Sequence, residues 1–293
     1  MVAPTSVLAR DLTATYPGAP RPALAGVDFA AGPGVHAVVG PTGAGKTTLL
    51  RVLAGQLPPA GGRAVVGGRN VGLRPLAARA GVGYVPQEVG LPHELSLAEY
   101  LDELLALDGE RGREARAGLA RQAAAAVHLD GALDRRLRHF SGGMRRRALL
   151  AQALARRPSV LLADEPSAGL DPEEQLTVRD LLRDLGLRCC VVLATHFLDE
   201  AEALGGRVTI LREGRVLRSG SVPQLLAAAR GMVWMVGADA EPGPGRVLQR
   251  TVEPGSRRLL GSPPAGTPAR PAPPTLEDAY LLALLGQLPG DAA

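Results

Sequence analysis

The stretch VVGPTGAGKTTLL, residues 38–50, holds the only lysine of the chain: of 33 Lys and Arg residues, all except Lys46 are arginine. The segment before the loop, HAVVG, has the apolar character of a buried strand. The segment after it, KTTLLRVLAG, has the apolar spacing of a helix that stops at Gly55. A strand, a glycine loop and a helix follow one another, which predicts an α/β unit.

The loop fits the pattern G-x-x-x-x-G-K-[ST], which binds phosphate when it joins a strand to a helix. Backbone N–H groups and the helix N-terminus form a concave anion site, and glycines let the main chain approach the phosphates. A compact ammonium fits between β- and γ-phosphate oxygens, where a planar guanidinium is too large. Thr47 is placed to offer a hydroxyl to Mg²⁺, and Thr48 to reach the α-phosphate. The predicted nucleotide contacts in this loop are Gly40, Pro41, Thr42, Gly43, Ala44, Gly45, Lys46, Thr47 and Thr48.

Length and composition are those of a globular chain. Its 293 residues are 46% hydrophobic, with a formal charge of +4. They hold no run of 18 apolar residues and no signal-peptide pattern, so we expect a cytoplasmic protein without a membrane span. Adjacent Cys189 and Cys190 lie in the apolar run CCVVLAT, which predicts buried thiols rather than a disulfide or a metal site.

The chain divides by pattern into a large and a small part. Residues 1–228 alternate strand and helix patterns, which favours a parallel sheet covered by helices, with a helical insert at about residues 88–157. Composition changes after about residue 230, so residues 229–293 are predicted to form a small extension of short strands and a last helix. Within it, the proline-rich linker 262–274 is expected to be extended and unpaired.

Polar residues follow two apolar runs at the point where each strand is expected to end. Asp164 and Glu165 close the run VLLADEP, and His196 closes the run VVLATH. Beside phosphates, Asp164 is predicted to hold Mg²⁺ and Glu165 to orient and deprotonate an attacking water. His196 is either a structural histidine or a donor to the γ-phosphate. Gln87, in YVPQE, is equally compatible with an ordinary turn.

A second candidate anion site lies at FSGGMRRRALL. Ser141, Gly142 and Gly143 precede a helical pattern, so Ser141 is an ordinary N-cap or part of a site for another phosphate. The basic residues near it also permit binding to an anionic partner, but no aromatic residues interleave with them. We therefore interpret them as a solvated helix face and expect no nucleic acid. These basic residues are Arg135, Arg136, Arg138, Arg145, Arg146 and Arg147.

These pieces, in this order, resemble the ATP-binding subunit of an ABC transporter over about residues 5–226. GPTGAGKTT resembles Walker A, Gln87 the Q-loop, SGGM the signature, VLLADEP Walker B, SAGLD the D-loop and His196 the H-loop. Met144 stands where the family usually has Gln. SGGM with its arginines, THFLDEAE and the ending TLEDAYLLAL are similar to drug-resistance-type and polymer-type exporters.

The resemblance implies an α/β P-loop ATPase with a mixed or parallel core sheet, an antiparallel β subdomain, a helical insert and a small α+β C-terminal extension. It implies that ATP and Mg²⁺ bind, that Glu165, His196, Gln87 and Lys46 act in hydrolysis, and that Gln87 joins Thr47 and Asp164 at the metal. Asp171 of the D-loop is expected at the nucleotide. Tyr16 is either an aromatic that stacks on adenine or a core tyrosine.

The resemblance also implies partners. Two copies would face head to tail, so that each ATP lies between the Lys46 loop of one and the Ser141 segment of the other. ATP binding would close this dimer, and the helical insert would pass the movement to a separate membrane permease, which holds the subunit at the inner face of the membrane. The alternatives are a soluble ABC-type ATPase of translation or DNA repair, and a simple P-loop kinase. The kinase leaves SGGM and SAGLD without a purpose.

Overall fold

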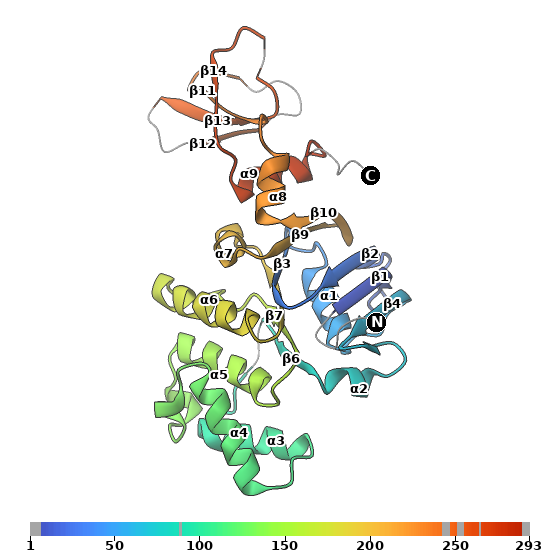
Figure 1. Ribbon diagram of the computed structural model, residues 1–293, viewed down its shortest axis with the longest axis vertical. Coiled ribbons are helices and arrows are strands. Elements are labelled where there is room, and N and C mark those ends of the chain that lie inside the picture. Colours follow the sequence, from blue (N-terminus) through green and yellow to red (C-terminus); the bar gives the residue numbers. More distant parts are fainter. Residues whose placement is uncertain (1–6, 88–89, 242–246, 251–254, 264, 289–293) are drawn as a thin grey trace.

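The computed structural model describes residues 7–87, 90–241, 247–250, 255–263 and 265–288 (Figure 1). The predicted boundaries at residues 1, 88 and 293 lie outside this part of the chain. The described strands form three sheets, one of six strands and two of four. In Figure 1 the helices α3, α4 and α5 lie at one end of the long axis and the C-terminal sheet lies at the other.

The six-stranded sheet positions the residues that the sequence singles out. Its spatial order is β10-β9-β3-β8-β7-β6, and every neighbouring pair is parallel except β9 and β10. The strands are β3 (Gly34–Val39), β6 (Val82–Val85), β7 (Val160–Asp164), β8 (Cys190–Thr195), β9 (Arg207–Arg212) and β10 (Arg215–Ser221). Because β3, β8 and β7 are parallel neighbours, their carboxyl ends meet at one edge of the sheet.

Strand β8 shows how this sheet is covered on both faces. Val191 and Leu193 pack in one apolar cluster with the helix residue Leu150, whereas Val192 packs in another with Leu49. Alternate residues therefore face different layers, and the whole strand is buried. Burial on both faces explains why the sequence here is a continuous apolar run.

An antiparallel sheet covers one side of the core. Its order is β2-β1-β4-β5, with bounds β1 (Val7–Ala14), β2 (Leu24–Ala31), β4 (Gly61–Val66) and β5 (Arg69–Asn70). Helix α1 (Lys46–Leu53) packs against both sheets. The short helix α2 (Pro75–Arg79) was not predicted, because five residues are too few to show a helical period.

The predicted helical insert is a lobe of three helices, α3 (Leu97–Leu107), α4 (Arg113–Ala125) and α5 (Gly142–Leu154). Two 3-10 turns, Asp130–Ala132 and Leu137–His139, join α4 to α5. Ser96 caps α3 as its sequence predicts: its hydroxyl accepts from the Glu99 backbone N–H at 3.2 Å, and the Glu99 carboxylate accepts from the Ser96 N–H at 2.7 Å. The lobe packs on the central sheet through α5 and β6.

Further helices connect the later strands. They are α6 (Pro172–Gly186), α7 (Leu198–Leu204) and α8 (Val222–Ala228). Cys189 directly precedes β8 and Cys190 is its first residue; both are free buried thiols, which confirms that prediction. Among the described residues, no helix has the length and apolar character needed to cross a bilayer.

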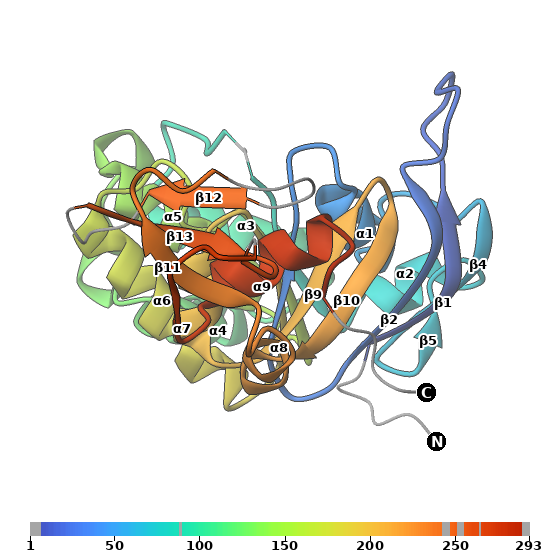
Figure 2. The same ribbon diagram turned by 90° about the horizontal axis from the view of Figure 1, so that it is seen from above.

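The C-terminal extension is an antiparallel sheet in the order β12-β13-β11-β14, followed by helix α9 (Leu276–Leu284). Seen from above in Figure 2, α9 lies between this sheet and the β9–β10 pair. Leu276 and Leu282 of α9 pack in one cluster with Val208 and Ile210 of β9. The extension therefore shares a hydrophobic core with the rest of the chain. Its strands are β11 (Val233–Gly237), β12 (Val247–Arg250), β13 (Ser256–Leu260) and β14 (Ala269–Pro271).

The prediction that the proline-rich linker is unpaired was wrong at one place. Strand β14, Ala269–Pro271, pairs with β11, opposite Val236, Met235 and Trp234. The strand lies at the edge of the sheet, where proline is tolerated because its missing N–H removes no bond from a central ladder. An extended segment beside an open edge therefore pairs with it despite its composition.

Candidate functional site

The predicted site residues converge because of the strand order. The Lys46 loop follows β3, His196 follows β8, and Asp164 and Glu165 end β7. These strands are adjacent in the sheet, with β8 between β3 and β7. Three segments far apart in sequence thus deliver polar groups to a single sheet edge, the position where open α/β sheets bind ligands.

The loop before α1 is shaped by its glycines. Gly45 has a φ of 104°, and a Cβ there would lie 2.6 Å from the Ala23 carbonyl oxygen, so only glycine fits. Within the loop, the Lys46 Nζ donates to the carbonyl oxygens of Gly40 at 2.8 Å and Pro41 at 3.2 Å. Burial lowers the pKa of the Lys46 ammonium. The cation is held inside the loop and is only 8% exposed.

Thr47 and Asp164 form a pair of oxygen donors beneath the loop. The Thr47 hydroxyl donates to the Asp164 Oδ1 at 3.2 Å, while the Oδ2 is buried without a hydrogen-bond partner. Burial raises the pKa of the Asp164 carboxyl group. A buried carboxylate oxygen without a partner is costly unless a ligand takes it up, and a hard cation is suited to that oxygen.

Asp164 is not part of a dense metal centre. The residues that the structure describes contain no cluster of three or more His, Cys, Asp or Glu side chains arranged to hold a metal. A cation here would therefore need most of its ligands from water and from a bound phosphate group. That arrangement suits Mg²⁺, which is commonly held by one or two carboxylates together with substrate phosphates.

Glu165 and His196 face one another across the ends of β7 and β8. The Glu165 Oε2 lies 2.7 Å from the His196 Nδ1 and also accepts from the His196 backbone N–H at 3.3 Å. Its Oε1 lies 4.0 Å from the Lys46 Nζ. The Glu165 side chain is 8% exposed, against 52% for His196. The carboxylate is thus fixed from two sides, and the imidazole is open toward solvent.

Tyr16 lies beside the same helix and is not a core residue. Its hydroxyl lies 3.4 Å from the Thr48 hydroxyl, and the Arg51 guanidinium donates to it at 3.4 Å. The half-buried ring lines a cavity of about 350 Å³ together with Arg51 and Tyr84. The position is compatible with the predicted contact to a base, which stays a prediction.

The Ser141 segment lies elsewhere, at the start of α5 in the helical lobe (Figure 1). The Ser141 hydroxyl caps α5 by accepting from the Met144 N–H at 3.1 Å. Gly142 is exposed and lines a cavity of about 560 Å³ together with Gln87 and Gly169. The structure therefore brings Gln87 close to the signature segment and leaves that segment outside the Lys46 group.

The D-loop residue Asp171 has a structural role within this chain. Its Oδ1 accepts from the Glu174 backbone N–H at 2.9 Å and so caps α6. Nearby, a Cβ at Gly143 would lie 2.0 Å from the Glu174 carboxyl carbon, so the Glu174 side chain of α6 occupies the space beside this glycine. The predicted contact of Asp171 and Gly143 with nucleotide stays a prediction.

The interpretation of the basic cluster as a solvated helix face was wrong for Arg146. Its side chain is buried and donates to the carbonyl oxygens of Pro86 at 3.1 Å, Gln87 at 3.0 Å and Glu165 at 2.8 Å. The spacing 143, 146, 150 could have revealed it, since buried helix positions recur every three or four residues. Arg146, which is not among the predicted site residues, therefore bonds to two of the predicted site segments.

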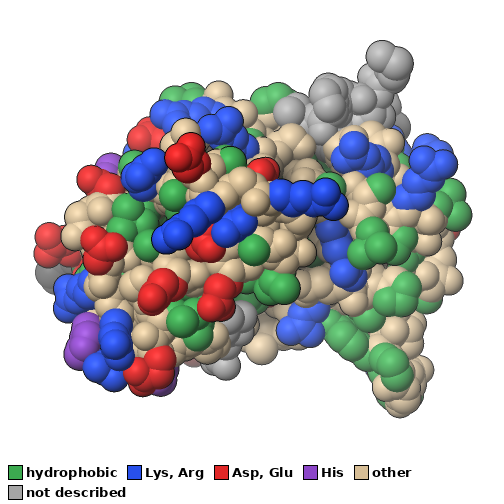
Figure 3. Space-filling model, turned by 90° about the horizontal axis from the view of Figure 1, so that it is seen from below, with side chains coloured by type: hydrophobic (Ala, Val, Ile, Leu, Met, Phe, Trp, Pro, Cys, Tyr) green, Lys and Arg blue, Asp and Glu red, His purple; other side chains and the backbone are tan. Residues whose placement is uncertain are grey.

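Other members of the basic cluster do lie at the surface. Arg136 and Arg138 both form ion pairs with Glu94, at 3.2 and 3.0 Å. Figure 3 looks at the molecule from below and shows basic side chains interspersed with acidic ones over much of that face. The prediction that no nucleic acid binds remains a prediction.

Known proteins match this chain in sequence. The family model described as ABC transporter matches residues 24–168. A daunorubicin resistance ATP-binding protein of Streptomyces coeruleorubidus is 39% identical over 213 residues, which are 72% of this chain and 67% of that protein. A Nod factor export ATP-binding protein I of Paraburkholderia xenovorans is 37% identical over 208 residues, which are 70% of this chain and 68% of that protein.

Solved structures match the fold. A dimeric ATP-binding cassette in a post-hydrolysis state, bound to ADP and Pi, is 25% identical with a TM-score of 0.65, and the match covers 73% of this chain and 98% of that one. A dimeric bacterial ABC transporter cassette matches with a TM-score of 0.66, 25% identity and the same coverage. These matches confirm the predicted family and the α/β P-loop fold. This chain belongs to the ABC transporter family and is an ATP-binding cassette that hydrolyses ATP.

Proposed function

We propose that this chain is the ATP-hydrolysing subunit of an exporter, and that it couples ATP-driven closure of a dimer to a separate membrane permease. The names of its relatives support export, since they include drug resistance and Nod factor export proteins. The observation that carries the mechanism is the separation of two phosphate-binding segments, the Lys46 loop at the sheet edge and the Ser141 segment in the helical lobe.

Mg²⁺ and ATP bind at the end of β3. The Lys46 ammonium leaves its loop carbonyls for the β- and γ-phosphate oxygens, because phosphate is the stronger acceptor. Thr47 and Asp164, which are already paired, would hold Mg²⁺, and Gln87 would be a further ligand. When bound, the ion neutralises charge that develops on the phosphate oxygens. Tyr16 stacks on the adenine.

Glu165 acts as the base. One of its oxygens is held by His196, and the carboxylate is largely shielded from solvent, so it is fixed in orientation before substrate arrives. It orients and deprotonates the attacking water, while the exposed imidazole donates to the γ-phosphate. Positioning and charge stabilisation supply most of the catalysis.

A second copy completes each site. In a head-to-tail dimer, Ser141 and the N–H groups of Gly142 and Gly143 from one copy meet the γ-phosphate held by Lys46 of the other. Asp171 of the facing copy lies beside it. ATP then bridges the two copies, so that binding closes the dimer and hydrolysis loosens it. The dimeric state of the similar cassettes supports this arrangement.

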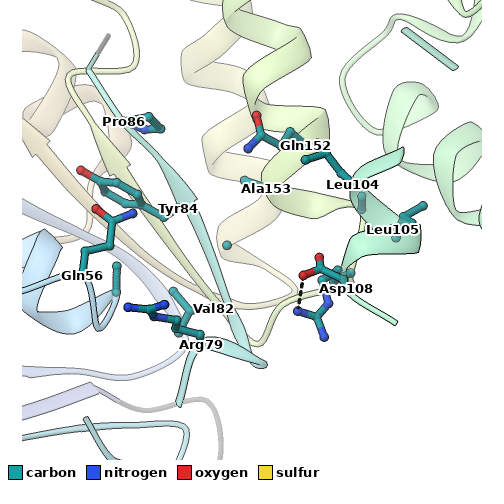
Figure 4. A pocket seen from close by; sticks show the side chains of 14 residues that line it. Gln56, Arg79, Val82, Tyr84, Pro86, Leu104, Leu105, Asp108, Gln152 and Ala153 are labelled. Carbon is teal, nitrogen blue, oxygen red and sulfur yellow. Dashed lines mark ion pairs between the residues drawn. The ribbon is translucent and has the colours of Figure 1, made fainter. Parts of the chain in front are cut away.

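The permease docks between the two lobes. A cavity of about 600 Å³ lies there (Figure 4), with Tyr84 and Arg79 on one wall and Leu104, Asp108 and Gln152 on the other. Its walls belong to the β6 side and to α3 and α5, so a segment seated in it contacts both lobes. Such a segment would hold the chain at the inner face of the membrane.

Domain roles follow from this division of labour. Residues 1–228 form the ATPase domain, with the helical subdomain at about residues 88–157. Residues 229–293 form an extension that covers β9 and β10, supported by the bond from Arg212 to the Leu284 carbonyl oxygen at 2.7 Å. The linker 262–274 belongs to this extension.

Glu165→Gln tests the proposal. We expect the variant to bind Mg-ATP but to hydrolyse it at least about tenfold more slowly than wild type, because the amide cannot take the proton. Light scattering should show a doubling of molar mass with Mg-ATP and a monomer without it. Turnover at the wild-type rate would remove Glu165 as the base, and a monomer at saturating ATP would remove the dimer.

A further inference from the structure

Arg146 is buried between the Gln87 segment and the catalytic strand end. One guanidinium nitrogen, Nη1, donates to the carbonyl oxygens of Pro86 and Gln87, and the other, Nη2, donates to the carbonyl oxygen of Glu165. The side chain is 7% exposed. A single planar group thus bonds to two segments that follow different strands, β6 and β7.

Burying the Arg146 guanidinium costs free energy, and its hydrogen-bond partners are specific. Burial lowers the pKa of the guanidinium, and the charges of Asp164 and Glu165 partly offset that effect. The guanidinium donates to main-chain carbonyls rather than to a carboxylate. Taking a charge out of water costs free energy, so a charge buried in this way indicates that the position of those carbonyls matters.

The backbone of Glu165 gives the reason for such a brace. Glu165 has a φ of 49°, in the left-handed region that a residue with a side chain adopts only at a cost in free energy. Its N–H donates to the Ala194 carbonyl oxygen at 2.8 Å, and its own carbonyl accepts from Arg146 at 2.8 Å. The strained peptide is therefore held at both ends.

We propose that Arg146 is a positioning residue, which joins the Gln87 segment to the strained backbone of Glu165 and so passes movement of that segment to the catalytic carboxylate. This inference rests on the proposed role of Glu165 as the base. When the lobes move relative to one another, the Gln87 and Pro86 carbonyls move the guanidinium, and the guanidinium moves the Glu165 peptide. The carboxylate then changes its alignment without any contact between Gln87 and Glu165.

Arg146→Gln and Arg146→Lys test it. Arg146→Gln removes the fork, so we expect kcat to fall about tenfold or more while KM and the Kd for Mg-ATP stay within about twofold. Arg146→Lys keeps a cation with three donors and should recover part of kcat. The matched control is Arg116→Gln in the helical lobe, because Arg116 likewise donates to two main-chain carbonyls, those of Glu110 and Arg111, and in addition to the Asp102 carboxylate.

Hydrogen exchange distinguishes loss of the Arg146 connection from a general loss of stability. In Arg146→Gln, peptides that contain Gln87 and those that contain Glu165 should both exchange faster than in wild type. In Arg116→Gln, faster exchange should be confined to α3 and α4. If Arg146→Gln does not fold, Arg146→Lys alone decides, through the same kcat and exchange measurements.

Three outcomes would overturn the proposal: an unchanged kcat in Arg146→Gln, equal losses of kcat in Arg116→Gln, or faster exchange at only one of the two segments. Failure of the underlying function is seen separately. Glu165→Gln is measured in parallel, and wild-type turnover there removes the base itself, whatever Arg146 does. Slow turnover in Glu165→Gln with full turnover in Arg146→Gln removes only the inference.

Discussion

Helices α1 and α5 begin in similar local sequence, a glycine-containing turn, but in different surroundings. At α1 the N-cap is Gly45 in a left-handed conformation, and around the first turn lie Lys46, Asp164 and Glu165, all nearly buried. At α5 the N-cap is Ser141, which uses its own hydroxyl to satisfy the helix and is itself exposed. The N-terminus of α1 is enclosed by charged groups from the ends of two strands, β3 and β7, and the N-terminus of α5 is open.

The difference gives the two proposed anion sites different roles. An N-terminus with a cation, a metal ligand and a base beside it can hold and process a phosphate group. An N-terminus without them offers N–H groups and a hydroxyl only, which suits contact with a phosphate already held elsewhere. In the proposed dimer, the N-terminus of α1 is the reacting half of a site, and the N-terminus of α5 is the closing half.

The largest expected effect comes from removing the cation at the N-terminus of α1. Lys46→Ala should weaken Mg-ATP binding about 100-fold, since charge-assisted bonds to phosphate oxygens are lost. Isothermal titration with Mg-ATP checks this, with Arg121→Ala on the exposed surface of α4 as control. Unchanged affinity would mean that α1 and α5 do not differ in the way proposed.

A mixing experiment tests whether the Ser141 segment of one copy acts on the nucleotide held by another copy. Ser141→Arg and Lys46→Ala should each be nearly inactive alone. Mixed dimers have one site with both intact segments, so random mixing should restore about a quarter of wild-type activity if the sites act independently. ATPase rates of the two variants, separately and combined, decide this. No gain on mixing would argue against a head-to-tail pair.

Asp164→Asn should separate function from stability. We expect Mg-dependent hydrolysis to fall at least about tenfold, while the free energy of unfolding without ligand rises by about 1 kcal/mol, because a buried charge with an unpartnered oxygen disappears. Since burial raises the pKa of Asp164, the neutral acid is favoured in the folded state. The protonated Asp164 side chain therefore stabilises the fold at pH values below the ordinary Asp pKa. This stabilisation is lost as the pH rises through the raised pKa of the folded state.

The gain in stability from Asp164→Asn should therefore shrink at acidic pH. Urea denaturation at neutral and at acidic pH measures this. An equal gain at both pH values would show that the carboxylate charge is not its cause.

The smallest expected effect is on stability, in a comparison of two serine N-caps of the helical lobe. Ser96→Ala and Ser141→Ala should each lower the free energy of unfolding by about 1 kcal/mol, because each loses an N-cap bond. Only Ser141→Ala should also lower kcat/KM. Thermal unfolding and steady-state kinetics on both variants check this. Equal kinetics in the two would make Ser141 a plain cap.

Much of the site around Lys46, and several helix caps elsewhere, could be predicted from sequence. The pattern around Lys46, the acids after β7 and the caps at Ser96 and Thr275 depend on residues a few positions apart, so local sequence carries them. Thr275 caps α9, since its hydroxyl accepts from the Asp278 N–H three residues later. The role of Arg146 could not be assigned in this way, because its three acceptors come from residues 19 to 60 positions away. Arginine beside arginine predicts surface unless its partners are known.

The sequence by itself determined a strand, a phosphate loop and a helix, because glycine geometry, apolar period and helix capping act over short distances. The tertiary structure alone decided three things: that β3, β8 and β7 are neighbours, that Arg146 is buried among carbonyls, and that Ala269–Pro271 pairs with an open sheet edge. Each depends on which surfaces meet when the apolar layers pack, and residues distant in sequence acquire contacts only through that packing.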